Sequence, residues 1–528
     1  MIKTNSQNLI LILILSFVLL SANIGGLYIY ALDEAKNSSC AREMMETGDF
    51  VVPTFNYELR TDKPPLHYYF MMAAYSIFGV NAFSARIFSV IMGVTTILCI
   101  WYFAFRYYGS RTALYTSLVL ISSLHYILQF HMAVPDPYLI FLMTLGFVAF
   151  YIFYREDKPV FLLIAYLSFG LGVLVKGPVS IALPGLAILL FLIIKRTFNW
   201  SYFLKLRPLW ILAVLVFIIA PWFIMVGLKT EGVWLKDFFL RHNLERYTDT
   251  MEGHGAIFLV TPLMVIIGLL PFSQFVVQGF RLGWKNRRTE DLLLYSGLIS
   301  LTIITFFAFS STKLPNYTVP VYPFVALLIG RYLAILQDDF QKYRKSTSAS
   351  LWTYLFIAMA LPVGLYFGIS FDPVLAMQKN LSWYFLIIPA GALTALFFFY
   401  RSVYKGMVLS LSVSWIVTIL LFFYIIFPKI DQLNPVARLW PSMDTGKPVA
   451  AYRIYNSAFS FYLKRPVPTL QTPEAMADYI RETGEGYIIT RKVFMEELEG
   501  LDNITVIGEA KDIFEIPTTV VYGISIRE

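Results

Sequence analysis

Apolar segments of roughly 17–24 residues recur along most of this chain, and each is long enough to cross a hydrocarbon core about 30 Å thick as a helix. Hydrophobic residues make up 58% of the 528 positions and charged residues only 14%, whereas soluble domains contain roughly 25% charged residues. We therefore expect a polytopic α-helical membrane protein. About thirteen spans are predicted, near residues 9–31, 82–105, 112–129, 137–154, 159–175, 178–194, 209–227, 256–279, 291–309, 317–335, 350–370, 382–400 and 406–427.

The distribution of basic residues predicts how these spans are oriented. Lysine and arginine are enriched in cytoplasmic loops, and with a cytoplasmic N-terminus every inner loop carries them. The residues are Arg106, Arg111, Arg155, Lys158, Lys195, Arg196, Lys205, Arg207, Arg281, Lys285, Arg287, Arg288, Lys342, Arg344, Lys345, Arg401 and Lys405. The stretch from Leu66 to Gly79 is too short for a span, and counting it as one would place these clusters outside. We expect it to be an interfacial or re-entrant helix.

With this orientation, the outer face receives residues 32–81, 130–136, 228–255 and 310–317. The apolar run from about Leu9 to Leu32 is longer than the roughly 7–15 residues of a signal-peptide core, so we expect a retained first transmembrane helix. Cys40 in a polar loop and Cys99 in a span are not expected to form a disulfide.

The composition changes after about Pro428. Helix-like stretches there alternate with short β-rich runs at Val449–Ile454, Tyr487–Arg491, Ile504–Ile507 and Thr519–Ile526. Thr472 followed by Pro473 is typical of a helix start, with an N-cap residue before proline at the first helical position. We predict a transmembrane domain over residues 1–427 and a small α/β domain over residues 428–528 on the outer side. A domain this small has a limited core of its own, so we expect it to dock onto the membrane part.

Charged side chains gather in the first outer loop, residues 32–81. Asp33 and Glu34 stand where the first span ends, and Asp62 and Lys63 precede two prolines, which fix φ and stiffen the backbone. Charges beside a bilayer are costly, so their presence indicates a function, and we interpret them as meeting a phosphate-linked substrate. The alternatives are a helix end with solvated acids and a lysine that extends along the membrane surface.

These motifs resemble those of the bacterial ArnT-like and dolichyl-phosphate-mannose–protein mannosyltransferase-like enzymes, which are GT-C glycosyltransferases that use polyprenyl-phosphate sugars. The similarity begins with an acidic pair after the first span, then Ala-Arg-Glu-Met, Gly-Asp-Phe and Asp-Lys-Pro-Pro-Leu. Further matches are Val134–Asp136, Leu174–Pro178, Phe239–Tyr247 and Ser311–Tyr317. The chain departs from the family at Asp62, where the ArnT branch usually has Glu, and at Lys36, which replaces a common arginine and lacks its bidentate fork. The resemblance implies a GT-C fold.

Transfer of a sugar from a lipid phosphate requires fixed cations where negative charge develops on the leaving group. Lys63 is the first candidate for this role. Further candidates for binding the donor phosphate are Lys36, Arg241 and Lys313. The resemblance implies a single displacement with inversion at the anomeric carbon and no glycosyl-enzyme intermediate.

A hydroxyl acceptor also needs a general base within reach of its proton. Asp33 is the first candidate, with Glu34 or Asp62 behind it. If the acceptor is a phosphate, which is already anionic, Asp33 would orient it instead of deprotonating it.

Four further residues are predicted to bind the substrate: Asp136, Lys176, Tyr317 and His242. Plainer interpretations are a helix N-cap for Asp136, contact with the membrane surface for Lys176 and an ordinary interfacial tyrosine for Tyr317. The histidines form no metal motif on one helix face, so we expect no metal site and no required cofactor. His242 and His254 flank an acidic loop with Asp249 and Glu252, which leaves a divalent metal as an alternative.

We predict an inverting glycosyltransferase of a bacterial inner membrane, with a cytoplasmic N-terminus and a periplasmic active site and C-terminus, acting as a monomer. The expected donor is a sugar linked to undecaprenyl phosphate, and the expected acceptor is a lipid A-type glycolipid or another envelope glycan or protein. A protein O-mannosyltransferase-like enzyme of the same fold and a lipid-linked-sugar transporter or flippase are the alternatives. Transporters tend to place polar groups at the midplane, whereas this chain gathers them at one face. Its net charge of +8 lies mostly in short loops and does not indicate nucleic-acid binding.

Overall fold

The computed structural model describes residues 2–245, 257–513 and 515–525. Nine helices among them are long and apolar enough to cross a membrane, or ten if the bent pair Val260–Gly268 and Phe272–Lys285 is one span. The nine are Ala82–Ile121, Asp136–Glu156, Pro159–Lys176, Trp200–Lys229, Asp291–Phe309, Pro315–Asp338, Phe340–Phe371, Ala376–Tyr400 and Tyr404–Asp431. Two shorter apolar helices are Gln7–Leu20 and Val179–Ile194. The polytopic helical fold is confirmed, and the exact count of thirteen spans stays a prediction.

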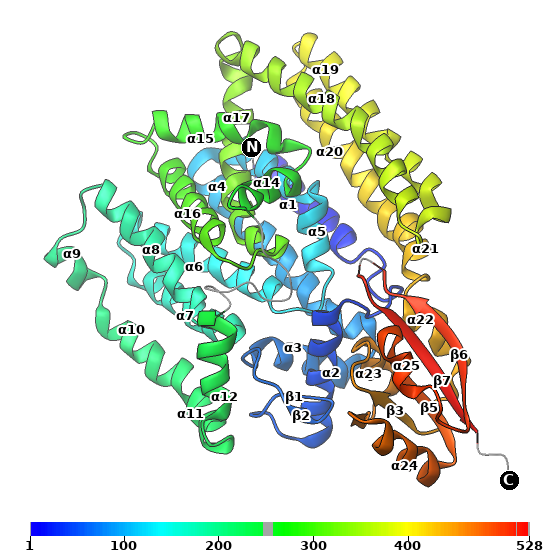
Figure 1. The fold of residues 1–528 in the computed structure, drawn as a ribbon. Coiled ribbons are helices and arrows are strands. Elements are labelled where there is room, and N and C mark those ends of the chain that lie inside the picture. The colour runs from blue at the N-terminus through cyan, green and yellow to red at the C-terminus, as the bar shows by residue number, and fades with distance from the viewer. Residues whose placement is uncertain (1, 246–256, 514, 526–528) are drawn as a thin grey trace.

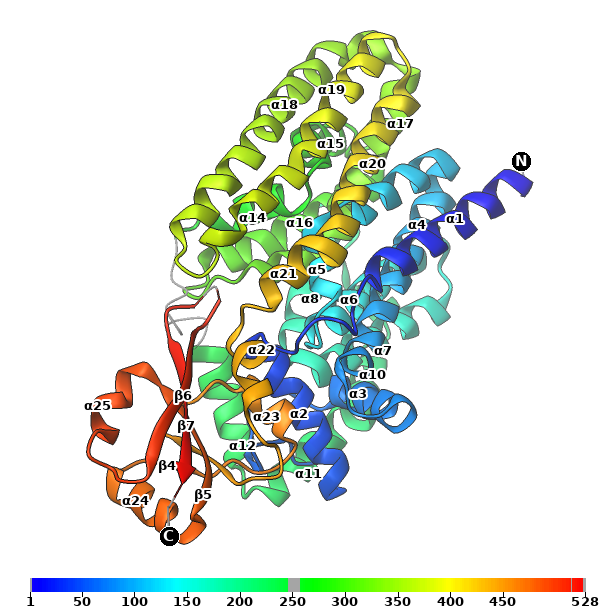
Figure 2. The same cartoon turned by 90° about the vertical axis from the view of Figure 1, so that its right-hand side faces the viewer.

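Figures 1 and 2 show the arrangement of these helices, with α18, α19 and α20 side by side and extending away from the sheet domain. In chain order the membrane part consists of α1 (Ile2–Leu20), α4 (Ala82–Ile121), α5 (Leu124–Phe130), α6 (Asp136–Glu156), α7 (Pro159–Lys176), α8 (Val179–Ile194), α9 (Trp200–Lys205), α10 (Pro208–Val214), η1 (Leu215–Ile219), α11 (Ala220–Lys229), α14 (Val260–Gly268), η3 (Phe272–Phe275), α15 (Val276–Lys285), α16 (Asp291–Phe309), η4 (Pro315–Val321), α17 (Tyr322–Asp338), α18 (Phe340–Phe371), η5 (Ala376–Leu386), α19 (Ile387–Tyr400), α20 (Tyr404–Leu421), η6 (Phe422–Ile426) and α21 (Phe427–Asp431).

Helix α4 covers the expected span 82–105 and the first part of the expected span 112–129, which continues in α5. Its helical path breaks at Gly109, where φ is 81° and ψ is 179°, so two helical stretches meet at a kink. Glycine adopts positive φ without the steric penalty of a Cβ. The predicted break between residues 105 and 112 therefore coincides with a real interruption. Asn81 begins the helix by accepting a hydrogen bond from the Ser84 N–H at 3.0 Å, a typical N-cap.

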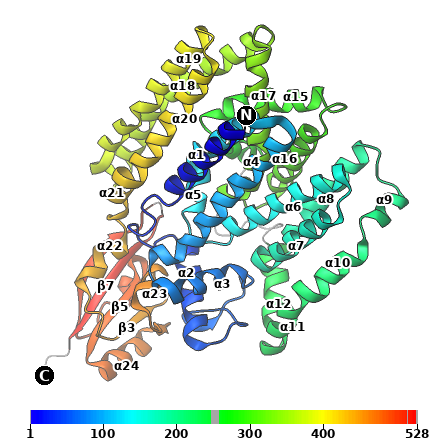
Figure 3. The ribbon, with the colours of Figure 1, turned by 180° about the vertical axis from the view of Figure 1, so that it is seen from behind.

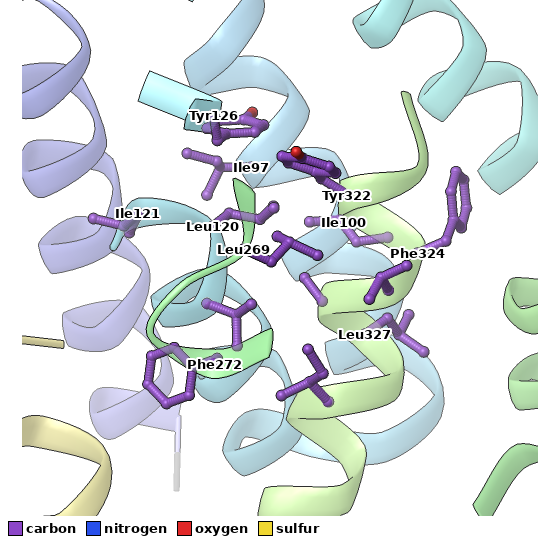
Figure 4. Close-up of a cluster of buried hydrophobic side chains, with 14 of the residues drawn as sticks. Ile97, Ile100, Leu120, Ile121, Tyr126, Leu269, Phe272, Tyr322, Phe324 and Leu327 are labelled. Carbon is purple, nitrogen blue, oxygen red and sulfur yellow. The ribbon is translucent and has the colours of Figure 1, made fainter. Parts of the chain in front are cut away.

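The centre of the membrane part is packed around α17. Of the nine candidate spans in the described residues, the one formed by η4 and α17 is the most buried. In its most apolar stretch of 18 residues, 89% is buried inside the protein. Figure 4 shows Leu327 of α17 in the same buried cluster as Ile100 of α4 and Leu269. At Gly330 the backbone of α17 approaches α4 so closely that a Cβ would lie 2.4 Å from Thr116 Oγ1. Small residues allow such close helix packing in membranes.

The first outer loop folds into α2 (Leu32–Thr47), a small hairpin of β1 (Thr54–Phe55) and β2 (Glu58–Leu59), and α3 (Leu66–Phe78). The carboxylate of buried Glu43 ties the hairpin to α2, because it accepts hydrogen bonds from Thr54 Oγ1 and the Asn56 and Tyr57 N–H groups, each at 2.9 Å. Helix α3 has 13 residues, too few to span a bilayer, as expected. In Figure 3, α2 and α3 lie between the sheet domain and the region of α10, α11 and α12 (Val233–Lys236).

The C-terminal residues form a mixed five-stranded sheet in the order β4-β3-β5-β7-β6. Strands β3, β4 and β5 are parallel neighbours, and β7 pairs antiparallel with both β5 and β6. The elements are α22 (Pro435–Leu439), η7 (Trp440–Ser442), β3 (Val449–Tyr452), α23 (Ala458–Leu463), β4 (Thr469–Leu470), α24 (Pro473–Thr483), β5 (Glu485–Arg491), η8 (Lys492–Phe494), α25 (Met495–Leu498), β6 (Ile504–Lys511) and β7 (Thr518–Ser525). Each of the four predicted β-rich runs contains a strand within the described residues, and Thr472 caps α24 by accepting from the Ala475 N–H.

This domain packs directly against the first outer loop. One buried apolar cluster contains Ala41 and Met44 of α2 together with Phe459 of α23. Asn56 and Val467 exchange two hydrogen bonds, Nδ2 to O at 2.8 Å and N to Oδ1 at 2.7 Å. The C-terminal domain thus shares a core with the loop that carries the charged motifs.

Candidate active site

One cavity of about 440 Å³ lies where the segments predicted for the outer face meet. Its wall contains six of the predicted site residues, Asp62, Lys63, Asp136, Lys176, His242 and Tyr317. They come from the loop before α3, the start of α6, the end of α7, η2 (Asp237–Glu245) and η4. Apolar side chains such as Leu139 and Phe238 complete the wall. Segments far apart in the sequence therefore form one pocket with both charged and apolar surfaces.

An ion pair forms one wall of the cavity. Lys176 Nζ lies 2.6 Å from Asp136 Oδ1. The same ammonium lies 5.1 Å from the centre of the Tyr317 ring, within range of a cation–π interaction. Tyr317 in turn packs on Phe307 at 4.7 Å between ring centres. Pro135, not Asp136, holds the N-cap position of α6, so the capping interpretation of Asp136 is wrong.

Asp62 is a second charged group on the cavity wall. Its Oδ1 lies 3.2 Å from His242 Nε2, and its Oδ2 lies 3.2 Å from Arg60 Nε. Burial alone would raise the pKa of Asp62, but the Arg60 guanidinium, followed by Lys63, His242 and Lys36, lowers it to about 2. Asp62 is therefore an anion at neutral pH. A carboxylate with so low a pKa is a weak general base.

Asp33 and Glu34 point to different surroundings. Asp33 is exposed in the first turn of α2, whereas Glu34 is buried. Arg86 of α4 binds both oxygens of Glu34, at 2.7 Å and 2.8 Å, and the Ala133 N–H donates to the same carboxylate at 2.8 Å. A carboxylate held on both oxygens by an arginine is unsuited to proton transfer. Glu34 instead connects α2 to α4 and to the turn before α6.

The remaining predicted cations lie around the cavity, outside its lining. Lys36 is half-buried one turn after Asp33 and acts on Asp62 electrostatically. Lys313 Nζ donates to the Ser310 carbonyl at 2.7 Å, and Ser310 lines the cavity. Arg241 is exposed beside His242.

No group of three or more histidine, cysteine, aspartate or glutamate side chains that could hold a metal occurs in the described ranges. Asp249, Glu252 and His254, which the sequence offered as partners of His242, lie outside the described residues. Cys40 is fully buried, and burial raises the pKa of its thiol to about 12, so this thiol is unreactive.

Arg60 is a functional candidate that the sequence motifs did not single out. It stands two positions before Asp62, and in an extended segment such residues point to the same side. This two-residue spacing from Asp62 was the feature of the sequence that could have pointed to Arg60.

The membrane part is similar to known glycosyltransferases. The family model of dolichyl-phosphate-mannose-protein mannosyltransferase matches residues 62–225. The undecaprenyl phosphate-alpha-4-amino-4-deoxy-L-arabinose arabinosyl transferase of Aeromonas hydrophila is 28% identical over 307 residues, 57% of this chain and 55% of that relative. A protein of Aquifex aeolicus without an assigned activity is 26% identical over 398 residues, 74% of this chain and 77% of its own length. This chain thus spans about half the length of the arabinosyl transferases it matches.

Solved structures show the same architecture. ArnT from Cupriavidus metallidurans, in a crystal structure with undecaprenyl phosphate, superimposes with a TM-score of 0.80 at 19% identity, covering 97% of both chains. The Archaeoglobus fulgidus oligosaccharyltransferase reaches a TM-score of 0.52 at 12% identity, over 93% of this chain and 70% of that one. The expected fold, a helical GT-C membrane domain with a small C-terminal sheet domain, is confirmed, and so is the resemblance to ArnT-like enzymes.

Proposed function

We propose that this ArnT-like membrane glycosyltransferase of the GT-C fold transfers one sugar from a polyprenyl-phosphate donor to an envelope acceptor. The observation that carries the proposal is the shared cavity of Asp62, Lys63, Asp136, Lys176 and Tyr317. It combines cations suited to a phosphate with an aromatic and apolar surface suited to a sugar ring and a lipid. The relative from Cupriavidus metallidurans binds undecaprenyl phosphate, which supports the same lipid as the carrier here.

Lys63 is the proposed main cation at the leaving phosphate, with Lys36 beside it. As the bond between the anomeric carbon and the phosphate oxygen breaks, negative charge grows on that oxygen, and a preorganised ammonium stabilises it. Asp62 holds a permanent negative charge next to these cations. It keeps them oriented when the site is empty, and the incoming phosphate can replace its contacts.

Asp33 is the proposed general base for a hydroxyl acceptor. Its position at the exposed start of α2 leaves its carboxylate open to an incoming hydroxyl group. The acceptor oxygen attacks the anomeric carbon from the side opposite the phosphate, and its proton passes to Asp33. One displacement of this kind inverts the configuration. If the acceptor is a phosphate, Asp33 orients it and takes no proton.

The proposed acceptor is a lipid A-type glycolipid at the periplasmic face of a bacterial inner membrane. Two observations support it: the similarity to the named arabinosyl transferases, and the basic loops, which predict a cytoplasmic N-terminus and a periplasmic C-terminal domain. A protein acceptor is the second candidate, because the matching family model describes protein mannosyltransferases. We propose no required cofactor and a monomeric enzyme.

Sugar release from an undecaprenyl-phosphate sugar by the purified protein tests this function. Asp33→Asn and Lys63→Ala should abolish release while the protein stays folded. Lys345→Ala, at an exposed lysine on α18, is the matched control and should leave release unchanged. Transport of the lipid-linked sugar across vesicles without release would instead identify a flippase.

A further inference from the structure

Arg60 is a buried arginine, with only 5% of its surface exposed. It does not line the cavity itself but contacts Asp62, which does. Two other segments fix its backbone. Its N–H donates to the Pro53 carbonyl at 2.9 Å, and its own carbonyl accepts from Trp234 Nε1 at 2.9 Å. The side chain therefore begins from a defined position beside Asp62.

The guanidinium of Arg60 uses little of its bonding capacity. An arginine carries five N–H donors, and here Nε donates to Asp62 Oδ2 at 3.2 Å. The Nη1 and Nη2 atoms are buried without a hydrogen-bond partner. Leaving charged donors unpaired in a protein interior is costly, and buried polar groups are almost always paired. An arginine that served only to stabilise the fold would not be left in this state.

Arg86 shows what a fully bonded arginine looks like in the same protein. It is 4% exposed, and all three of its nitrogens are bonded. Nε and Nη2 bind Glu34, Nη1 donates to the carbonyls of Ile24 and Leu27, and Nη2 also donates to the Tyr28 carbonyl. Arg60 is thus far less bonded than Arg86, although both side chains are buried.

The charges around Arg60 connect it to both acids of the site. Burial lowers the pKa of Arg60, but Tyr68, Asp62, Cys40 and Asp33 together raise it above its ordinary value, so the guanidinium stays charged. Its Nε lies 3.2 Å from Asp62 on the cavity wall, and Asp33 at the start of α2 acts on it electrostatically. An anion that binds near both acids would meet this cation.

We infer that Arg60 is a third cation of the phosphate site, beside Lys63 and Lys36, and that its Nη1 and Nη2 groups take up oxygens of a polyprenyl phosphate headgroup when the lipid binds. The planar fork of an arginine matches two phosphate oxygens, which the point charge of a lysine does not. The inference rests on the proposed function, because its ligand is the phosphate of the lipid carrier.

Binding of undecaprenyl phosphate to the purified full chain, followed by native mass spectrometry, tests the inference. Arg60→Met should weaken binding roughly tenfold or more, because hydrogen bonds to charged groups are worth about 1.5–3 kcal/mol. Arg60→Lys should retain part of the affinity. The Tm of Arg60→Met should fall only modestly, because the Arg60 side chain makes one hydrogen bond, to the half-buried Asp62. Arg86→Met, the control, should lower the Tm.

A second pair of variants separates direct binding from an effect through Asp62. If Arg60 contacts the lipid phosphate, Arg60→Met weakens binding by the same factor in the Asp62→Asn background. The inference would be overturned if Arg60→Met weakened lipid binding only when Asp62 is present. It would also be overturned if Arg60→Met left the affinity unchanged in both backgrounds. Lipid A also carries phosphate groups. If Arg60→Met weakened binding of lipid A but not of undecaprenyl phosphate, the inference would also be overturned.

The two proposals fail in different ways. If the wild-type chain does not bind undecaprenyl phosphate, the proposed function and the inference both fail. If the wild type binds, Lys63→Ala binds poorly and Arg60→Met binds normally, only the inference about Arg60 fails.

Discussion

Lys176 Nζ and Asp136 Oδ1 lie 2.6 Å apart at the cavity, although they belong to different helices. The pair joins the end of α7 to the start of α6, and Tyr317 rests against its ammonium. Because 17% of the lysine side chain and 6% of the aspartate side chain are exposed, neither charge is well solvated without the other.

Breaking this pair from one side should therefore cost more than removing it whole. Asp136→Ala and Lys176→Ala should each destabilise the protein, because each leaves a poorly solvated charge. The double variant should be less destabilised than the sum, with a coupling of about 0.5–3 kcal/mol. Thermal unfolding of the four proteins in one detergent measures this cycle, and additive effects would show that the two residues do not interact.

Loss of Lys63 should slow the chemical step as well as weaken binding of the lipid phosphate. Lys63→Ala should reduce kcat by roughly 10²–10³-fold, the usual effect of removing one donor to developing charge. Lys63→Arg should recover part of this rate, because it keeps the positive charge. Single-turnover measurement of sugar release distinguishes slow chemistry from weak binding. A normal kcat in Lys63→Ala would contradict the assignment.

Asp33 and Glu34 should respond in opposite ways to the same chemical change. Asp33→Asn should abolish transfer to a hydroxyl acceptor with little change in Tm, since Asp33 is exposed. Glu34→Gln should lower stability by about 3–5 kcal/mol, because Arg86 loses its buried counter-ion. Paired Tm and activity measurements on the two variants check this. If the Glu34→Gln protein stayed stable but lost its activity, Glu34 would be assigned a catalytic role.

The low pKa of Asp62, about 2, predicts a window of acid sensitivity. A carboxylate whose folded pKa lies below the unfolded value of about 3.9 contributes stability that is fully present above that value and is lost as pH falls toward 2. The Tm difference between wild type and Asp62→Asn should therefore shrink as the pH falls below about 4. A difference that stays constant from pH 5 down to 2 would place the pKa elsewhere.

Chelation should leave activity unchanged. The described residues contain no cluster of three or more metal-ligating side chains, and we expect sugar release to continue after treatment with EDTA and gel filtration. Loss of release that returns with one added divalent cation would establish a metal requirement. A zinc analysis of the purified protein provides an independent measurement.

Much of the architecture follows from local sequence chemistry. The N-cap at Thr472 and the interruption near Gly109 are both found where the residues predict them, because caps and positive φ depend on a few neighbouring atoms. The sharp bend of 115° between α14 and the segment η3–α15 was not predicted, since a run of apolar residues looks the same whether the helix is straight or broken.

The site was harder to predict in detail than the fold. Asp33 and Glu34 look equivalent as an acidic pair, but successive residues of a helix project about 100° apart, and only the packing shows which of them meets Arg86. Arg60 was missed because its two-residue spacing from Asp62 was a weak signal, and the unpaired donors of its guanidinium are seen only in the structure.

The C-terminal sheet domain holds the helix that carries Asp33. Arg42 of α2 donates to the Ser460 carbonyl at 3.1 Å, so this domain contacts the same sixteen-residue helix that begins with Leu32 and Asp33. It thereby supports the position of the proposed base. We expect that a chain cut after the last membrane helix still inserts in the bilayer but holds Asp33 out of alignment.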